Sequence, residues 1–274
     1  MPEDDFARFE HDGWQRVANK YDSVWASSTR QFIPPLLETV AVAPGMSVLD
    51  VGSGPGYVAA AASADGAEVI GIDFSSEMVS IAHRLFPALE FRVGDAQRLP
   101  FDAASFDRVV SNFALLHVTE PELACAEACR VLKPGGKFGF TVWAPPAENP
   151  YAKIIDDAIT TYGDPNAQIP AGPSHYVFSG EEGFRDAMIR AGFDRESMVL
   201  KLHQITWQVP NPRFVFDAER WAGVRTAGLL AMQSPERLQQ IRAAIEQGIE
   251  KYATQSGYAV PKSAYVAAAT KPGR

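Results

Sequence analysis

Apolar runs of strand length alternate with amphipathic helical patterns between about residue 40 and residue 143. Such an alternation is typical of β-α-β units, in which a helix returns the chain to begin the next parallel strand. The pattern predicts five strands, at residues 47–51, 68–72, 89–93, 108–112 and 137–143. It predicts intervening helices at residues 56–64, 76–85 and 121–132. The sequence therefore predicts an α/β protein with a mostly parallel, Rossmann-like sheet and helices on both faces.

The segments outside this core have other patterns. Apolar residues at helical spacing predict an N-terminal helical cap over residues 1–40 and a helical insertion over 211–255. Residues 144–178 hold six prolines and several aromatic residues without a clear period, so we expect a lid or substrate loop there. Residues 256–274 predict a final strand at the edge of the sheet. We expect one domain over the whole chain, with residues 41–143 as its core.

The composition limits the classes of partner. Lys and Arg number 25 against 33 Asp and Glu, and the resulting charge of -8 would repel a nucleic-acid backbone. The N-terminus is acidic where a signal peptide is basic, and no apolar run reaches the roughly 18 residues of a membrane span. We therefore expect a cytoplasmic protein that acts on a small molecule. Cys125 and Cys129 stand four apart in a helical pattern, which favours two small core residues over a redox pair.

A glycine-rich turn follows the first predicted strand. Gly52, Ser53, Gly54, Pro55 and Gly56 join this strand to a helix, and a ligand can lie directly against the backbone of such a turn. A dinucleotide fingerprint requires a further glycine where Tyr57 stands, which argues against NAD, and no Walker lysine is present. Alone, the turn is equally compatible with nucleotide binding and with a plain tight turn.

Two carboxylates at the ends of later strands change this balance. Asp73 ends the second predicted strand, where a carboxylate can accept hydrogen bonds from both ribose hydroxyls. Asp95 follows the third strand, where it can accept the exocyclic amine of adenine. Each carboxylate alone is as well explained by a helix cap. Together with the glycine turn they indicate a site for an adenosine-containing cofactor.

Five segments now resemble the class I S-adenosylmethionine (SAM)-dependent methyltransferases, in particular the subgroup similar to ubiquinone and menaquinone C-methyltransferases. They are VLDVGSGPGY at 48–57, GIDFS at 71–75, VGDAQRLPF at 93–101, FDRVVSNFALLHV at 106–118 and RVLKPGGKFGFTVW at 130–143. They stand in the family's order over about 95 residues. The resemblance implies a seven-stranded sheet, SAM as methyl donor and S-adenosyl-L-homocysteine (SAH) as product. It leaves C-, O- and N-methylation open, because this fold serves all three.

The resemblance also implies which residues contact the cofactor. Those expected at its amino-acid end are Gly52, Ser53, Gly54 and Gly56, with Asn112 and Phe113 bordering the methionine portion. Asp73 is expected at the ribose. The residues expected at the adenine are Phe74 and Met78 on one face and Asp95 and Ala96 at the edge, with Leu99 nearby. Tyr21 and Trp25 resemble an aromatic pair that closes over the cofactor in relatives.

Methyl transfer is an in-line displacement, so alignment and exclusion of water supply much of the rate. His117 follows the fourth strand and is our candidate general base, because its ordinary pKa suits proton removal from a phenol or an enol. A capping or core role explains His117 equally well, and His175 and His203 are rivals. We expect Tyr21 to orient the reacting group. No acidic cluster ends the fourth strand, which predicts a metal-independent enzyme.

Aromatic residues are frequent after the fifth predicted strand, in the segments expected to meet the acceptor. Even if most of them form core, the remainder would line an apolar pocket. We therefore expect C- or O-methylation of a small, largely apolar or aromatic molecule. A SAM-binding sensor without transferase activity and an NAD-dependent oxidoreductase are the alternatives. The sequence leaves the oligomeric state open, a homo-oligomer included.

Overall fold

The computed structural model describes residues 4–273, and the chain divides into two compact units. Unit 1 comprises the segments Met1–Ser28, Ala144–Gly172 and Gln204–Ala264. Unit 2 comprises Thr29–Trp143, Pro173–His203 and Tyr265–Arg274. The predicted cofactor-binding segments from residue 48 to residue 143 therefore lie in unit 2. The expectation of a single domain stays a prediction.

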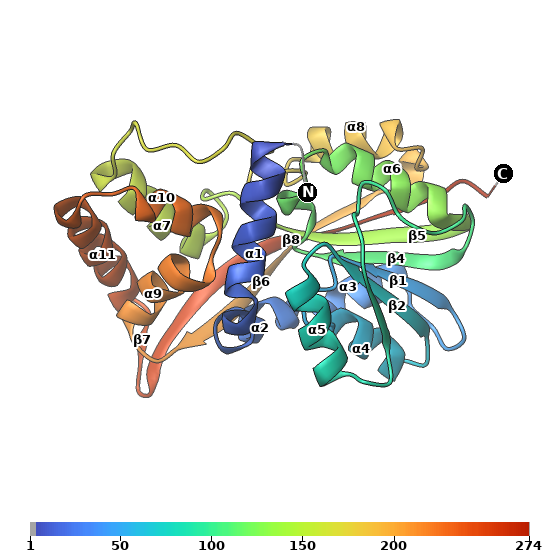
Figure 1. The fold of residues 1–274 in the computed structure, drawn as a ribbon, viewed down its shortest axis with the longest axis horizontal. Helices are drawn as coiled ribbons and strands as arrows, with labels where there is room; N and C mark the ends of the chain where they lie inside the picture. The colour runs from blue at the N-terminus through green and yellow to red at the C-terminus, as the bar shows by residue number, and fades with distance from the viewer. Residues whose placement is uncertain (1–3, 274) are drawn as a thin grey trace. The chain divides into compact units, whose positions relative to one another are not determined.

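An eight-stranded sheet forms the framework (Figure 1). Its strands are β1 (Ser47–Val51), β2 (Glu68–Asp73), β3 (Glu90–Val93), β4 (Phe106–Asn112), β5 (Leu132–Trp143), β6 (Val199–Val209), β7 (Ala253–Thr254) and β8 (Gly257–Thr270). The order is β3-β2-β1-β4-β5-β8-β6, with β7 paired to β8. Four neighbouring pairs from β3 to β5 are parallel. The predicted Rossmann-like, mostly parallel sheet is confirmed.

The strand order reverses at β1, which lies between β2 and β4. All three strands are parallel, so their carboxyl ends meet at one edge of the sheet. Consecutive residues of β1, from Val48 to Val51, are buried, as expected for a central strand that is covered on both faces. The loops after β1 and β4 leave toward opposite sides, and ligands bind at such a switch point.

Helices cover both faces of the sheet in unit 2 (Figure 1). They are α3 (Ile33–Val40), α4 (Tyr57–Ala64), α5 (Ser76–Leu85), α6 (Pro121–Val131) and α8 (Glu181–Arg190), with the short helices η1 (Arg30–Phe32), η2 (Leu115–His117) and η3 (Arg195–Ser197). One apolar cluster packs α6 and α8 against the sheet, and a second packs α3 and α4 on the other face. Cys125 and Cys129 are free and buried in the first cluster, which confirms their predicted place in the core.

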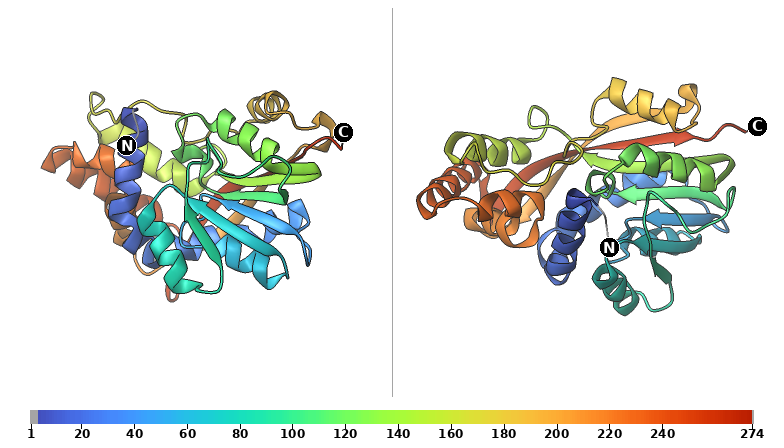
Figure 2. Two further views of the ribbon diagram at one scale, coloured as in Figure 1. Left: turned by 45° about the vertical axis from the view of Figure 1, so that its right-hand side comes forward. Right: turned by 45° about the horizontal axis from the view of Figure 1, so that its top comes forward.

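Unit 1 is mainly helical (Figure 2). Its helices are α1 (Asp5–Val24), α7 (Pro150–Tyr162), α9 (Pro212–Ala222), α10 (Arg225–Ala231) and α11 (Pro235–Glu250), while α2 (Ala26–Thr29) ends at the start of unit 2. Ile241, Ile245 and Ile249 form a buried stripe on α11 at helical spacing. A buried ion pair joins Arg225 of α10 to Glu10 of α1 at 2.5 Å. These contacts tie the N-terminal helix to the predicted helical insertion.

The segment 144–178 is not a continuous loop, because it contains the 13-residue helix α7. Asn149 caps this helix with its Oδ1, which accepts a hydrogen bond from the amide of Ala152, and Pro150 occupies the first turn, where proline is tolerated. The buried Tyr151, Ile154 and Ile155 then follow at helical spacing. The prediction of a loop treated every proline of the segment as a helix breaker, although Pro150 stands at a position where proline is compatible with a helix. The remainder of the segment is irregular.

The last long strand is not at an edge, which corrects a second expectation. β8 lies between β5 and β6, and the edges of the main path are β3 and β6. An internal strand is buried on both faces, and the run Val266, Ala267, Ala268 and Ala269 is buried accordingly.

None of the helices within residues 4–273 is both long and apolar enough to cross a membrane.

Candidate functional site

The glycine turn lies between β1 and α4 and leaves room beside its backbone. Gly54 has a φ of +50°, and a Cβ built on it would meet nothing within 4 Å. Gly52 and Gly56 instead face protein, since a Cβ would lie 2.1 Å from the Cβ of Ala114 and 2.6 Å from the ring of Phe91, respectively. Packing thus requires two of these glycines. The open space at Gly54 is where a ligand can approach the chain.

Asp73 connects the end of β2 to this turn. One carboxylate oxygen accepts a 2.8 Å hydrogen bond from the Gly54 amide, and the other accepts a 2.9 Å bond from the Ser75 amide. Burial raises the pKa of Asp73 to about 6, although these two amides and the charge of His117 lower it. Each carboxylate oxygen has a second lone pair, so Asp73 retains the capacity to accept two hydroxyl groups.

Asp50 is a candidate site residue that the sequence analysis did not select. It is fully buried in β1, and its Oδ2 accepts a 3.0 Å hydrogen bond from the Ala59 amide. Burial raises its pKa to about 7, with a smaller upward contribution from the charge of Asp73. A charged residue within a strand that is otherwise apolar was the available signal.

Three buried polar atoms near the ends of β1 and β4 have no hydrogen-bond partner among the described residues. They are Asp50 Oδ1, Ser53 Oγ and Ser111 Oγ. Buried polar groups are normally paired, so unpaired ones indicate a missing ligand or water. An amino-acid moiety supplies the ammonium donors and carboxylate acceptors that these atoms lack. Together with the room at Gly54, this set fits the methionine end of SAM.

The end of β4 has an unusual backbone that its neighbour fixes. Phe113 has a φ of +59°, a left-handed conformation that few residues other than glycine adopt. Its amide donates to the hydroxyl of Thr141 at 2.9 Å, and that hydroxyl donates to the side-chain oxygen of Asn112 at 2.7 Å. The Phe113 ring stacks on Trp143 with centroids 3.9 Å apart. Such a strained position is often retained at a binding site.

The residues expected at the adenine differ in exposure. Met78 is buried in α5, while Phe74 and Ala96 are half-buried. Asp95 is exposed, and its Oδ1 accepts a 2.8 Å hydrogen bond from the amide of Gln97, as in a turn-capping aspartate. Asp95 therefore caps a turn and not a helix, since no helix follows it directly, and an adenine contact there stays a prediction.

His117 ends the short helix η2 after β4 and is half-buried. Its charge is among the influences that lower the pKa of Asp73, so the imidazole lies in the neighbourhood of the predicted ribose site. This place agrees with a role near the reacting groups. His175 packs edge-on to Tyr176, and His203 lies on β6.

Tyr21 and Trp25 belong to unit 1 and are described within it. The Trp25 indole stacks on Trp207 with centroids 5.5 Å apart and donates to the carbonyl of Ala222. Tyr21 meets the ring of Trp14 edge-on at 6.1 Å. These packing contacts agree with a core role for both residues. Their predicted role over the cofactor stays a prediction.

Among the side chains of residues 4–273, no group of three or more His, Cys, Asp or Glu is arranged to hold a metal ion.

Known proteins resemble this chain in sequence and in structure. Residues 49–140 match a family model described as a methyltransferase domain. The chain is 32% identical over 196 residues to a demethylmenaquinone methyltransferase from Renibacterium salmoninarum, an alignment that covers 70% of this chain and 80% of the relative. The structure is similar to the YcgJ protein from Bacillus subtilis, with a TM-score of 0.57 and 20% identity over 88% of this chain and 98% of that one. It is also similar to a phosphoethanolamine N-methyltransferase from Haemonchus contortus in complex with SAH, with a TM-score of 0.58 and 19% identity over 99% of this chain and 61% of the other.

Proposed function

Because the chain belongs to the class I SAM-dependent methyltransferases, of the quinone C-methyltransferase-like type, we propose that it methylates a hydroxyl-bearing aromatic ring such as a reduced quinone. The resemblance to a relative named for demethylmenaquinone supports this acceptor class. Phe214 is a partly buried aromatic residue on the apolar cluster of unit 1, the kind of side chain that binds such a ring, whereas Trp207 is part of the buried core. The observation that carries cofactor binding is the open backbone at Gly54 beside Asp73.

In this proposal the residues of unit 2 bind and orient the cofactor. Asp73 accepts the ribose hydroxyls, and the turn from Gly52 to Gly56 contacts the amino-acid end. Asp50 and the buried serine hydroxyls pair with the ammonium and carboxylate groups. The remaining contacts are those of Phe74, Met78, Asp95, Ala96, Asn112 and Phe113. When bound, SAM supplies a methyl group on a positively charged sulfur.

The protein's role in the chemical step is to align the acceptor and remove its proton. With SAM held by Asp73 and the turn from Gly52 to Gly56, the acceptor carbon or oxygen would take up the methyl group, and the sulfur would keep the electrons of the broken bond. His117 accepts the proton that the acceptor loses, and Tyr21 orients the reacting group. General-base catalysis of this kind contributes a factor of roughly 10²–10⁴. Alignment of the reactants and exclusion of water, which avoids solvent reorganisation during the reaction, contribute separately.

The test is incubation with methyl-labelled SAM and a panel of reduced naphthoquinones, phenols, indoles and fatty acids. We expect label in the quinols, and isotope analysis of the product distinguishes a C-methyl from an O-methyl group. Asp73→Ala serves as the control for turnover at this site. Binding of SAH without turnover of any acceptor would favour a SAM-binding sensor, and hydride transfer from NADH would favour an oxidoreductase.

A chelator tests the expected independence from metals. We expect turnover to persist in EDTA, because alignment and a protein base suffice for the reaction. Loss of turnover that magnesium restores would contradict this part of the proposal.

A further inference from the structure

We propose that Arg130 and Glu127 are positioning residues for the adenine of the cofactor, acting through the loop after β3. This inference rests on the proposed function, in which Asp95 and Ala96 of that loop contact the adenine. Neither Arg130 nor Glu127 is among the residues expected to touch SAM. They act on the backbone of the segment that does.

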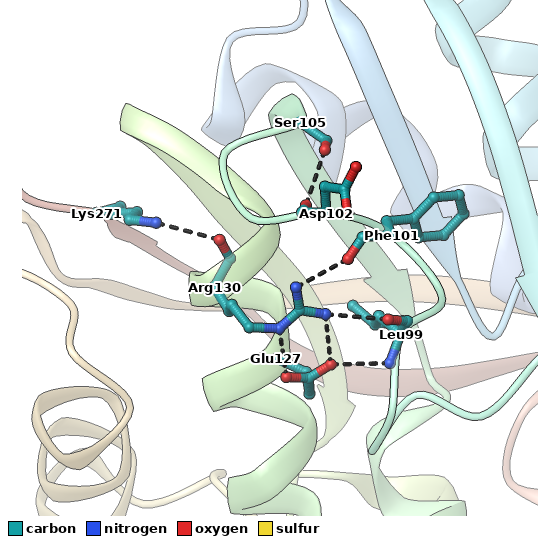
Figure 3. Close-up of polar contacts among 7 residues, drawn as sticks. All are labelled: Leu99, Phe101, Asp102, Ser105, Glu127, Arg130 and Lys271. Carbon is teal, nitrogen blue, oxygen red and sulfur yellow. Dashed lines mark hydrogen bonds and ion pairs between the residues drawn. The ribbon is translucent and has the colours of Figure 1, made fainter.

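Arg130 holds the loop by its carbonyl groups (Figure 3). Its Nη1 donates to the carbonyl of Phe101 at 2.8 Å, and its Nη2 donates to the carbonyl of Leu99 at 3.0 Å. A planar guanidinium can serve both carbonyls at once because its donors diverge at fixed angles. The two ends of the tripeptide from Leu99 to Phe101 are therefore fixed to a single side chain.

Glu127 completes the arrangement from one turn earlier in α6. Its Oε1 accepts from Arg130 Nε at 2.6 Å, and its Oε2 accepts from Arg130 Nη2 at 2.8 Å (Figure 3). The same Oε2 accepts the backbone amide of Leu99 at 2.9 Å. The pair lowers the pKa of Glu127 and raises that of Arg130, so both stay charged near neutral pH. Leu99 is thus held at its amide and at its carbonyl.

Other contacts hold the first half of the loop, where the Gly94 amide donates to the carbonyl of Asp73 at 2.9 Å and Gln97 Oε1 accepts from the Glu120 amide at 2.7 Å. The residues from Gly94 to Asp102 form no helix or long strand, and within them Asp95 accepts local hydrogen bonds from the amides of Gln97 and Arg98. Leu99 is buried, and Asp95 is exposed four residues earlier. A short chain of this length transmits the position of a fixed residue to its neighbours. The α6 pair therefore fixes the second half of the loop, next to the adenine-contacting residues.

Helix α6 is itself fixed at this end. Lys271 donates from its ammonium to the carbonyl of Arg130 at 3.3 Å (Figure 3). It also donates to the carbonyl of Leu132 at 2.7 Å. These carbonyls belong to the C-terminal turn of the helix and the first residue of β5, where a cation is favourable. The turn of α6 that carries Arg130 is thus hydrogen-bonded to Lys271 and continues directly into β5 of the sheet.

A second ion pair on the same helix provides a matched control. Glu122 of α6 accepts from Arg190 of α8 at 2.8 and 3.1 Å, and both side chains are exposed. This pair has the same chemical groups as Glu127 and Arg130, but it bonds to no backbone group of the loop. Any general effect of losing an ion pair from α6 should appear in both pairs.

The experiment compares Glu127→Gln and Arg130→Lys with Glu122→Gln and Arg190→Lys in the full-length protein. We expect the first two to weaken SAH binding roughly tenfold, since one or more charge-assisted hydrogen bonds are lost. The KM for SAM should rise by a similar factor, while kcat at saturating SAM changes less than about twofold. Hydrogen exchange should become faster at the Leu99 amide and its loop. The two control variants should show none of these changes.

A purely structural role predicts a different result. Glu127→Gln and Arg130→Lys would then lower the melting temperature as the control variants do, and the Kd for SAH measured well below that temperature would equal the wild-type value. That result overturns the inference, as does a fall in kcat at unchanged KM for SAM. Glu127→Gln keeps an acceptor for the Leu99 amide, so it remains informative if Arg130→Lys does not fold. A wild-type protein that fails to bind SAH would contradict the proposed function itself.

Discussion

The ammonium nitrogen of Lys262 lies 4.3 Å from the centre of the Tyr151 ring, in the core of unit 1. The rings of Trp25 and Trp207 are 4.8 and 4.7 Å from the same nitrogen. The lysine is only 1% exposed, and burial lowers the pKa of its amine to about 7, although the charge of Glu219 raises it. Three aromatic rings stabilise the charged form through their π faces but do not replace its hydration.

We predict that, because of Lys262, the free energy of unfolding rises with pH between about 7 and 10.5. Between its folded pKa of about 7 and its ordinary value of 10.5, the unfolded chain binds more protons, so raising the pH favours the folded state. The free energy of unfolding should therefore rise by up to about 1.4 kcal/mol per pH unit in this range. Lys262→Met should abolish this slope. Denaturant titrations at several pH values measure it. Lys153→Met removes an exposed lysine from α7 and should keep the wild-type slope, and a parallel curve for Lys262→Met would disprove the prediction.

Cofactor affinity should fall as pH drops through 6. Asp73 must be ionised to accept two ribose hydroxyls, and its pKa of about 6 means that the ionised fraction falls roughly tenfold per unit below that pH. Calorimetry with SAH from pH 5 to pH 8 measures the effect. Asp73→Asn should remove the part of the dependence centred near pH 6 and weaken binding at pH 8 by about 2 kcal/mol or more. Wild-type affinity in that variant would remove Asp73 from the site.

Gly54→Val should weaken SAH binding, while Gly45→Val should not. Both glycines have positive φ, at +50° and +79°, and a Cβ at either meets nothing within 4 Å. The backbone strain of valine is therefore similar at the two positions, of the order of 1–2 kcal/mol. Gly54 lies beside Asp73, to which its amide donates, whereas the Gly45 amide donates to the carbonyl of Gly66. Equal SAH titrations for the two folded variants would contradict the assignment of the turn.

His117→Gln should reduce kcat about a hundredfold or more, because proton removal from the acceptor loses its base. Affinity for SAH should change much less. His175→Gln and His203→Gln are the comparison variants, and each should keep most of the activity. Steady-state kinetics with the best acceptor from the panel measure all three. Retained kcat in His117→Gln together with a loss in either comparison variant would transfer the role.

Tyr21→Phe should lower kcat without changing stability appreciably, since only a hydroxyl is removed. Tyr162→Phe, at an exposed position on α7, is the control. A point substitution is preferable to deletion of the N-terminal segment, because Phe6, Glu10 and Trp25 are buried in unit 1 and their loss would disrupt its core. If folded Tyr21→Phe turns over as fast as wild type, Tyr21 is not catalytic.

Elements with a clear local signal could be predicted closely. The helix expected at 76–85 is α5, at the same residues, where Ser75 caps the helix and the apolar positions follow its period. The helix α7 was missed because its cap and first-turn proline lie in a proline-rich stretch. The internal place of β8 depends on which strands pair, and that is decided by contacts distant in sequence.

The candidate site shows the same division. Its glycine turn and Asp73 belong to a strand–turn–helix pattern that the sequence makes visible. Asp50 reads as part of a strand, and its raised pKa depends on burial and on the nearby charge of Asp73. The hydrogen bonds from Arg130 to the carbonyls of Leu99 and Phe101 join residues about thirty positions apart, and no spacing rule predicts them. Tertiary packing decides such contacts.

The division of the chain between its two units has a consequence for exchanging parts with relatives. The polypeptide passes from one unit to the other at 28/29, 143/144, 172/173, 203/204 and 264/265. Each unit is thus assembled from three stretches, and two of the passages fall inside the strands β6 and β8. No single cut releases a unit as an uninterrupted fragment. A chimera that grafts unit 1 of another methyltransferase onto this one must replace three stretches together and preserve the pairing register of two spliced strands.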